Sequence, residues 1–238
     1  WDAGGDPAEI ARLDNLRKQF QKGVDAFKEY GKDFYSLPWY VMVGEPGSGK
    51  TEAIRHSDLR FRGTLQDMLQ GTGGTYSMDW WFTNQAVLLD TAGAMLMNPE
   101  ATQRFEEFLK LLRSYRPDCP VNGIILAIPV DSLLADNAAK LEEKAKRIAQ
   151  QFTIIQKALD VRFPIYLMVT KSDRLPGFRE FTDAPGQQTF DREMLGWSNP
   201  ADLDAPFDPA YIAGALETIA ERLDGRRRPG HLLRQLRH

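Results

Sequence analysis

The residues from Gly44 to Thr51 have the types and spacing of a phosphate-binding loop. The stretch reads Gly44-Glu45-Pro46-Gly47-Ser48-Gly49-Lys50-Thr51 and follows the apolar run at 39–43. It fits the pattern G-x-x-x-x-G-K-[ST], whose glycines allow successive backbone N–H groups to turn inward around an anion. We expect residues 45–51 to hold phosphates, with Lys50 as the catalytic cation at the outer phosphates and Thr51 as a Mg²⁺ ligand. The helix that starts near residue 50 would add its positive N-terminal end.

A second motif, Asp90-Thr91-Ala92-Gly93, follows the apolar residues 86–89. P-loop proteins bind Mg²⁺ through an aspartate at the carboxyl end of a core strand, and a glycine N–H there can sense a γ-phosphate. The motif alone would also fit a plain turn. The motif follows the phosphate-binding loop by about 40 residues, and this spacing favours a joint site. We therefore assign Asp90 to Mg²⁺ and Gly93 to the nucleotide.

A third motif, Thr170-Lys171-Ser172-Asp173, ends the apolar run at 165–169. In GTPases a [NT]-K-x-D element at this place recognises guanine: the aspartate accepts from the base and the lysine stem lies along the ring. A charged turn would explain the residues in isolation, but the order of the three motifs favours base binding by Lys171 and Asp173. No downstream element completes a guanine pocket, so the choice between GTP and ATP stays open.

The loop at 63–74, which ends in glycines and threonines, is expected to be a mobile switch. Thr75 is the candidate for a further Mg²⁺ ligand, and Thr72 is the alternative, because a threonine in this loop can bind the ion when a γ-phosphate is present. Ordering of the loop by a triphosphate would then report which nucleotide is bound.

Ala94 stands where many GTPases place a glutamine that orients the attacking water. Alanine cannot do this, so slow hydrolysis is expected. No residue identifies itself as an arginine finger, although Arg55, Arg60 and Arg62 lie near enough in sequence to be candidates. Three functions remain open: a nucleotide-dependent switch that hydrolyses slowly, a non-catalytic interaction scaffold, and an ATPase that powers assembly.

The elements that position these motifs follow from the hydrophobic periodicity. Apolar runs at 39–43, 79–82, 85–89, 124–128 and 165–169 predict strands, the second and third joined by a turn at 83–84 and the last two fully buried. Amphipathic helices are expected from residue 50, over 99–115 with Asn98 as its cap, and over 138–159. This alternation predicts an α/β P-loop NTPase of GTPase-like topology, with a mostly parallel sheet and helices on both faces.

Residues outside this alternation suggest three parts. A helix over 7–31 predicts an N-terminal helical extension at 1–34, which we expect to pack against the body. The P-loop domain would cover 35–178. A loop rich in proline, glycine and aspartate, followed by a helix over about 210–223, predicts a C-terminal helical appendage at 179–238. The aromatic residues 80–82 are expected in the core.

Composition narrows the class of protein further. A net charge of -3 over 238 residues gives no sign of nucleic-acid binding. The single cysteine, Cys119, cannot form an internal disulfide, which fits a reducing compartment. No apolar stretch reaches the length of a membrane span. The chain begins with Trp1 instead of methionine, and we expect it to be part of a longer protein.

Taken together, these residues resemble the IcmF family of type VI secretion proteins, also called TssM. The resemblance runs over roughly 35–197 and rests on Leu37-Pro38-Trp39-Tyr40 before the P-loop, Gly73-Gly74-Thr75, Asp79-Trp80-Trp81-Phe82, Leu89-Asp90-Thr91-Ala92-Gly93, Arg116-Pro117, Val121-Asn122-Gly123-Ile124 and Thr170-Lys171-Ser172-Asp173-Arg174-Leu175-Pro176-Gly177-Phe178. It implies a cytoplasmic GTPase-like domain of a bacterial inner-membrane protein. It also implies docking to membrane components similar to TssL and to baseplate proteins, with GTP or ATP and Mg²⁺ as ligands.

Overall fold

The structure is a computed structural model that describes residues 6–29, 31, 33–57, 59, 78–93, 98, 101–183, 196–202, 204–206 and 208–227. The chain divides into two compact units, Trp1–Leu175 and Pro176–His238. All three sequence motifs belong to the first unit. In the second unit the described helices are α8 (Phe178–Thr182) and α9 (Ala210–Arg227).

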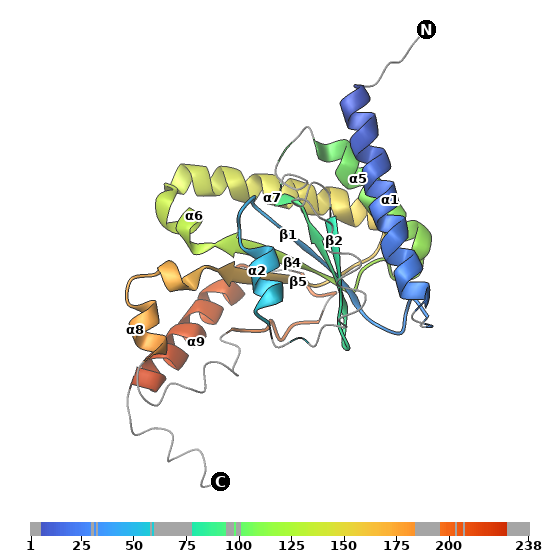
Figure 1. Cartoon of the computed structure of the whole chain (residues 1–238). Coiled ribbons are helices and arrows are strands. Elements are labelled where there is room, and N and C mark those ends of the chain that lie inside the picture. The colour runs from blue at the N-terminus through green and yellow to red at the C-terminus, as the bar shows by residue number, and fades with distance from the viewer. Residues whose placement is uncertain are drawn as a thin grey trace. The chain divides into compact units, whose positions relative to one another are not determined.

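The first unit is built on a five-stranded sheet with the strand order β2-β3-β1-β4-β5 (Figure 1). Its strands are β1 (Trp39–Gly44), β2 (Met78–Phe82), β3 (Val87–Thr91), β4 (Gly123–Pro129) and β5 (Ile165–Thr170). β2 pairs with β3 in antiparallel orientation, and the other three pairings are parallel. The expected hairpin and the mostly parallel sheet are therefore confirmed. Parallel pairing brings the carboxyl ends of β1, β3, β4 and β5 to one edge.

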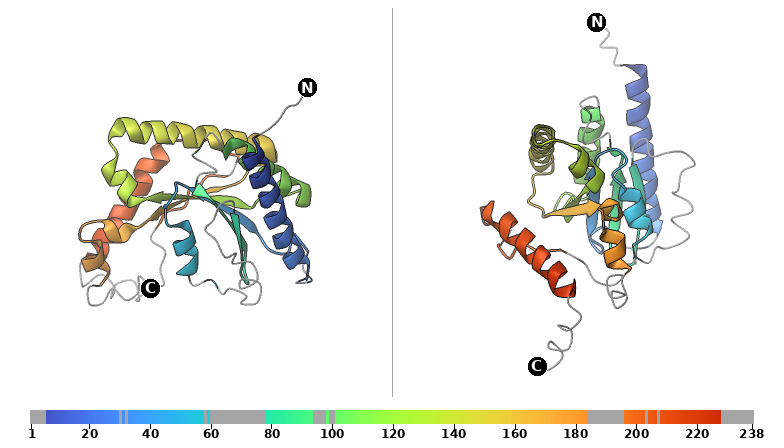
Figure 2. Two further views of the ribbon diagram at one scale, coloured as in Figure 1. Left: turned by 45° about the horizontal axis from the view of Figure 1, so that its top comes forward. Right: turned by 90° about the vertical axis from the view of Figure 1, so that its left-hand side faces the viewer.

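Alternating side chains divide the core between the two faces of the sheet. On one face Val41, Leu89 and Leu126 join a large cluster with residues of three long helices. These are α1 (Pro7–Glu29), α5 (Thr102–Tyr115) and α7 (Ala138–Leu159). On the other face Met42 and Leu88 join a smaller cluster with Ile54 of the short helix α2 (Lys50–Arg55). The views in Figure 2 show α1, α5 and α7 on one side of the sheet and α2 on the other, so helices cover both faces as expected.

Helix α1 is an integral part of this core. Its apolar side, Leu16, Phe20, Val24 and Phe27, is almost completely buried. Gly23 lies on the same side, where an added Cβ would come within 2.2 Å of the Trp80 indole. A glycine is needed at this position because the helix backbone rests directly on that ring.

The aromatic residues 80–82 are core residues, which confirms the expectation. Trp80 and Phe82 are buried toward α1, and their rings stack with centroids 5.6 Å apart. Trp81 is buried on the opposite face, where the Arg55 guanidinium lies 6.0 Å from its ring centroid. Adjacent residues of one strand point to opposite faces, so the three rings anchor β2 to both halves of the core.

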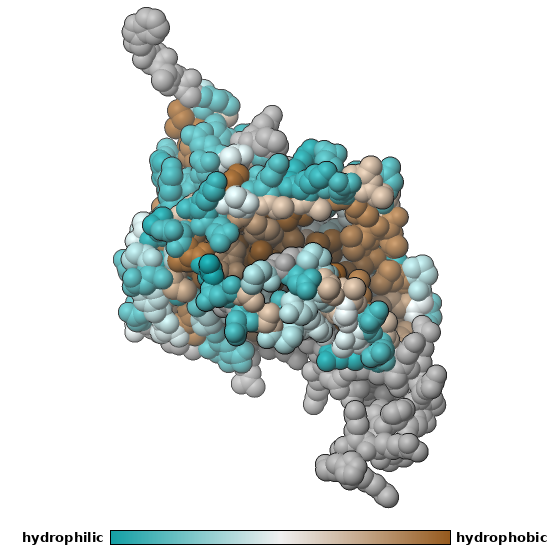
Figure 3. Space-filling model, turned by 180° about the vertical axis from the view of Figure 1, so that it is seen from behind, coloured by the Kyte–Doolittle hydropathy of each residue, from teal (hydrophilic) through white to brown (hydrophobic). Residues whose placement is uncertain are grey.

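Two expectations about the elements are wrong, and one helix was not expected. β5 is not fully buried: it is the edge strand, and Ile165, Tyr166, Leu167 and Val169 are each between 47% and 63% exposed. Figure 3 shows an extended apolar area on the molecule seen from behind. The apolar pattern of a short segment does not distinguish an edge strand from a central strand, because both can be continuously apolar.

The other two differences concern helices. Helix α5 begins at Thr102, and its cap position is occupied by Ala101 instead of Asn98. The Ala101 N–H donates to the Asn98 carbonyl oxygen over 3.0 Å. A short helix that the periodicity did not reveal, α6 (Val130–Ala135), follows β4 directly. By contrast, α7 has the expected bounds, 138–159, with the side chain of Asn137 accepting from the Lys140 N–H at its start.

Candidate nucleotide-binding site

The predicted phosphate-binding loop joins β1 to α2 at the carboxyl edge of the sheet (Figure 1). Gly47 and Gly49 have φ angles of 70° and 82°, in the left-handed region that glycine enters without strain. The Ser48 N–H donates to the Glu45 carbonyl oxygen over 3.1 Å, which folds the loop back on itself. The strand, the glycine-rich turn and the helix thus occur in the order that a phosphate cradle requires.

Lys50 is buried at the base of this loop. Its side-chain nitrogen Nζ lies 3.4 Å from both the Glu45 carbonyl oxygen and Ser48 Oγ, distances at the weak end for hydrogen bonds. Burial lowers the pKa of Lys50, and the nearby Asp90 partly opposes that effect. A buried ammonium with weak hydrogen bonds is a favourable partner for an incoming phosphate.

Thr51 and Asp90 meet at the adjoining edge of β3. The Thr51 hydroxyl donates to Asp90 Oδ2 over 2.5 Å, and Asp90 is completely buried. The other carboxylate oxygen, Oδ1, has no hydrogen-bond partner among the residues that the structure describes. Burial raises the pKa of Asp90, whereas Thr51, Lys50 and Arg55 act in the opposite direction. A hydroxyl and a buried carboxylate with a spare oxygen are hard donors that fit Mg²⁺.

Gly93 lies directly against the phosphate-binding loop. A Cβ at this position would stand 2.4 Å from the backbone nitrogen of Pro46 and 2.7 Å from the carbonyl carbon of Glu45. The two segments can approach this closely because residue 93 has no side chain. The tertiary structure thus brings together the first two motifs, which lie far apart in sequence.

The third motif contacts the other side of the same loop. The Thr170 hydroxyl donates to the Ser48 carbonyl oxygen over 2.6 Å, and both residues are buried. The side chain of Lys171 lies beside Gly49, where an added Cβ would be 3.9 Å from its Cγ and Cε atoms. Asp173 follows in the short 3-10 helix Ser172–Arg174. Of the predicted base-binding residues, Lys171 therefore lies next to the predicted phosphate-binding loop.

Asp131, in the first turn of α6, holds this third motif in place. Its Oδ2 accepts from Lys171 Nζ over 3.1 Å and from Arg174 Nη1 over 2.6 Å. The hydrogen bond from Lys171 is the largest cause of a lowered pKa for Asp131. Sequence reasoning missed Asp131, although its place directly after an apolar run was a usable signal.

A second group of polar side chains surrounds Glu45 of the loop. Lys144 of α7 contacts the Glu45 carboxylate at 3.0 Å and Asp136 Oδ2 at 2.5 Å. Ser132 Oγ lies 3.1 Å from Glu45 Oε2 and 2.6 Å from Lys144 Nζ. Lys140 completes the set, 2.5 Å from Asp136 Oδ1. Sequence reasoning missed these partners because Lys144 is 99 residues from Glu45.

This cluster predicts that the free energy of unfolding depends measurably on pH in the acidic range. Hydrogen bonds from Lys140 and then Lys144 lower the pKa of Asp136 from 3.8 to about 2. Because the folded-state pKa is the lower one, the cluster's contribution is complete above pH 3.8 and is lost as the pH falls toward about 2. We expect Asp136→Asn to destabilise the protein at pH 6, and this difference from wild type to shrink steadily below pH 4. Urea unfolding of both proteins at several pH values measures it, and a difference independent of pH would contradict the assignment.

Asp79 is a further acidic residue at this edge, and none of the three nucleotide-binding motifs includes it. It lies opposite Asp90 in the β2–β3 pairing. Burial, and then the neighbouring Asp90, raise the pKa of Asp79, while Arg55 partly offsets them. The site therefore concentrates negative charge around Asp90, which also favours a divalent cation.

Several predicted site residues lie outside the described residues. They are Thr75 and its alternative Thr72, Ala94, the arginines Arg60 and Arg62, and the loop at 63–74. Arg55 is described, and its guanidinium forms an ion pair with Glu52 at 2.9 Å. Within the described residues no group of three or more histidine, cysteine, aspartate or glutamate side chains could hold a metal ion by itself.

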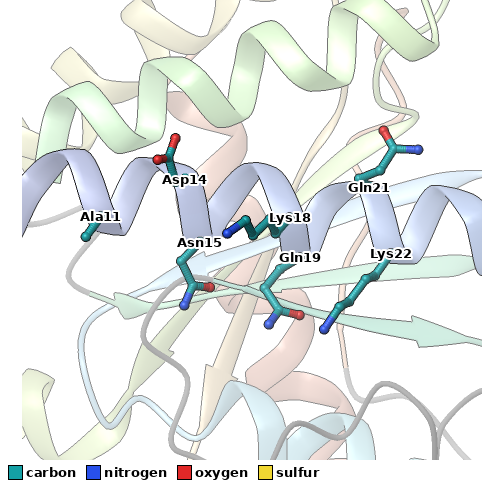
Figure 4. Close-up of a pocket in the computed structure, with 7 residues that line it drawn as sticks. All are labelled: Ala11, Asp14, Asn15, Lys18, Gln19, Gln21 and Lys22. Atoms are coloured by element: carbon teal, nitrogen blue, oxygen red, sulfur yellow. The ribbon is translucent and has the colours of Figure 1, made fainter.

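A hollow of about 540 Å³ lies along the polar side of α1 (Figure 4). Its lining residues are Ala11, Asp14, Asn15, Lys18, Gln19, Gln21 and Lys22. Asp14 and Gln21 point away from the others (Figure 4), so the lining does not converge on a ligand. It is separate from the three motifs and gives no indication of function.

The fold and the loop together define a P-loop α/β domain with a mostly parallel, GTPase-like sheet. The sequence profile of the IcmF-related N-terminal domain matches residues 99–233, more than half of the chain, and the chain belongs to this family. That match extends beyond residue 197, where the resemblance in the sequence had faded. Among the residues described, no helix is both long and apolar enough to cross a bilayer.

One curated relative is the type VI secretion system component TssM1 of Pseudomonas aeruginosa. It is 42% identical over 160 residues, which cover 64% of this chain and 14% of that protein. The chain thus corresponds to a small part of its relative.

Two solved structures are distantly similar. One is a probable GTP-binding protein EngB, with a TM-score of 0.39 and 16% identity over 78% of this chain and 97% of that one. The other is the ADP-ribosylation-factor-like small COPII coat GTPase SAR1 from Encephalitozoon cuniculi in complex with GDP. Its TM-score is 0.28, with 12% identity over 77% of this chain and 87% of that one. Likenesses this weak carry no argument about function.

Proposed function

We propose that this domain binds a Mg²⁺-nucleotide, GTP in preference to ATP, and acts as a slow nucleotide-dependent switch in a type VI secretion membrane complex. The observation that carries the proposal is the convergence of three motifs on one loop. Lys50 lies beneath it, Gly93 contacts it at Pro46, and Thr170 bonds to its Ser48 carbonyl oxygen. Parallel pairing brings the ends of β1, β3 and β5 to one edge of the sheet, and residues of all three motifs meet there at the same loop, as binding of one nucleotide would require.

In this proposal each residue has a defined task. The backbone N–H groups of 45–51, except at Pro46, and the Lys50 ammonium hold the phosphates, and Gly93 offers its N–H to the γ-phosphate. Thr51 and Asp90 would hold Mg²⁺, with Thr75 as a further ligand. When bound, the ion would neutralise negative charge on the phosphates. Lys171 and Asp173 contact the base, while Asp131 fixes the position of Lys171.

The role in secretion rests on family membership. A TssM relative is a type VI secretion component, so we propose that this domain belongs to the cytoplasmic part of an inner-membrane protein. Its partners would be membrane components similar to TssL and baseplate proteins. The nucleotide state of the loop would regulate their assembly.

Base preference provides the direct test of the binding proposal. Calorimetric titration with GTP, ATP, GDP and ADP in the presence of Mg²⁺ should show guanine nucleotides binding at least about tenfold more tightly, since the Asp173 carboxylate can accept from the N–H groups of guanine, whereas adenine offers no matching pair of donors. Asp173→Asn should remove most of that preference while leaving ATP affinity unchanged. Equal affinity of wild type for GTP and ATP would move the ATPase function ahead.

Two other outcomes separate the remaining classes of function. Absence of binding to any of the four nucleotides would favour a scaffold that keeps the fold without the ligand. Rapid steady-state phosphate release that Lys50→Ala abolishes would contradict a slow switch, because the proposal assigns no residue to orient the attacking water.

A further inference from the structure

Glu45 is an electrostatic anomaly in the candidate site. Its carboxylate belongs to the loop that should hold phosphates, and a negative charge there would repel them. The Glu45 side chain is 23% exposed, so water screens its charge only in part. A loop that binds anions with this residue at its second position needs a compensating cation.

Lys144 is placed to be that cation. Its Nζ lies 3.0 Å from Glu45 Oε1 and 3.1 Å from Oε2, so it contacts both carboxylate oxygens. Contact with Asp136 and Glu45 raises the pKa of Lys144 against the opposing effect of burial. The lysine is therefore charged at neutral pH. Its position is fixed from behind by Asp136, whose side chain is 4% exposed.

The charges of this cluster balance. Glu45 and Asp136 supply two negative charges, while Lys140 and Lys144 supply two positive ones. Ser132 adds hydrogen bonds without charge, contacting Glu45 and Lys144 over 3.1 and 2.6 Å. A phosphate group at the loop thus meets a neutral cluster on this side and the Lys50 ammonium at its base.

We propose that Lys144 supports the phosphate-binding loop by acting through Glu45: it neutralises the negative charge of that carboxylate, so that the loop accepts phosphate. This inference deepens the proposed function and rests on it. It also assigns a task to a residue of α7 that no P-loop motif includes.

A charge-balance experiment tests the proposal. Lys144→Gln keeps a hydrogen-bond donor but leaves the cluster with one excess negative charge. At an effective dielectric constant near 20, such a charge on the order of 10 Å from the phosphates should weaken binding about tenfold. Glu45→Gln/Lys144→Gln restores neutrality, and we expect its affinity to return to within about threefold of wild type. Glu45→Gln alone should bind at least as tightly as wild type.

The probes are Mg²⁺-GTP and inorganic pyrophosphate, titrated by calorimetry into each variant. Pyrophosphate lacks a base, so an equal loss for both probes would assign the effect to the phosphate site. Lys146→Gln is the matched control, because Lys146 is on the same helix but pairs with Glu142 on an exposed surface, where its side chain is 71% exposed. Thermal unfolding verifies that every variant is folded.

The outcomes separate this inference from the proposed function. A folded Lys144→Gln variant with wild-type affinity, or a double variant as weak as Lys144→Gln, would overturn the role of Lys144 and leave nucleotide binding intact. If wild type binds neither probe, the proposed function itself is wrong. A tenfold loss that the second substitution reverses supports the inference, because damage to packing would not be repaired by removing another side chain.

Discussion

Replacing Lys50 with alanine is expected to lower the affinity for Mg²⁺-nucleotide by about 100-fold or more, the largest effect of any single side chain here. Lys50 is 6% exposed, and the two hydrogen bonds of its ammonium are both 3.4 Å long. The ammonium therefore loses little hydrogen-bond energy when it moves to contact a phosphate. Calorimetric titration of wild type and Lys50→Ala with Mg²⁺-GTP measures the difference.

The fold should survive this substitution. Burying an ammonium costs free energy, as the lowered pKa of Lys50 indicates, so alanine removes an unfavourable burial together with the ligand contact. Thermal unfolding of the ligand-free protein should thus change little, and Lys146→Ala should change neither property. Equal affinity of wild type and Lys50→Ala would show that the loop is not a phosphate site.

Gly93→Ala is expected to reduce nucleotide binding by a similar factor through backbone displacement. The new Cβ would lie 2.4 Å from Pro46 N and 2.6 Å from Pro46 Cα, closer than nonbonded atoms can approach. Both obstacles are backbone atoms, so the loop or the segment after β3 must move. A displacement of about 1 Å at such a site can cost on the order of 100-fold in function.

Gly214→Ala is the matched control for this substitution. Gly214 is a helical residue of α9 with no atom within 4 Å of an added Cβ, and alanine favours a helix. We expect that variant to bind nucleotide as wild type does. If Gly93→Ala bound Mg²⁺-GTP normally, the close approach of the second motif to the loop would have no functional meaning.

The sequence alone determined the class of fold, because local patterns encode it. The residues from Gly44 to Thr51 fit the pattern of a phosphate-binding loop, and their position after an apolar strand was visible in the sequence. Helix α7 has the bounds that its apolar periodicity predicted, Ala138–Leu159. The family membership followed from several short motifs in one order and is now shown.

Tertiary structure decided which residues surround the loop. The contact between Glu45 and Lys144 spans 99 residues, and the contact between Ser48 and Thr170 spans 122. No periodicity records such pairs, since each residue is compatible with its own helix or strand whatever its partner. The exposure of β5 likewise could not be predicted from the sequence. Whether an apolar strand lies in the centre or at the edge of a sheet depends on the order in which all strands pair, and β5 is last in that order. The chemical type of a side chain and the local pattern around it can be recognised in the sequence. Which distant residues come into contact depends on the packing of the whole chain, and this cannot be inferred from one sequence.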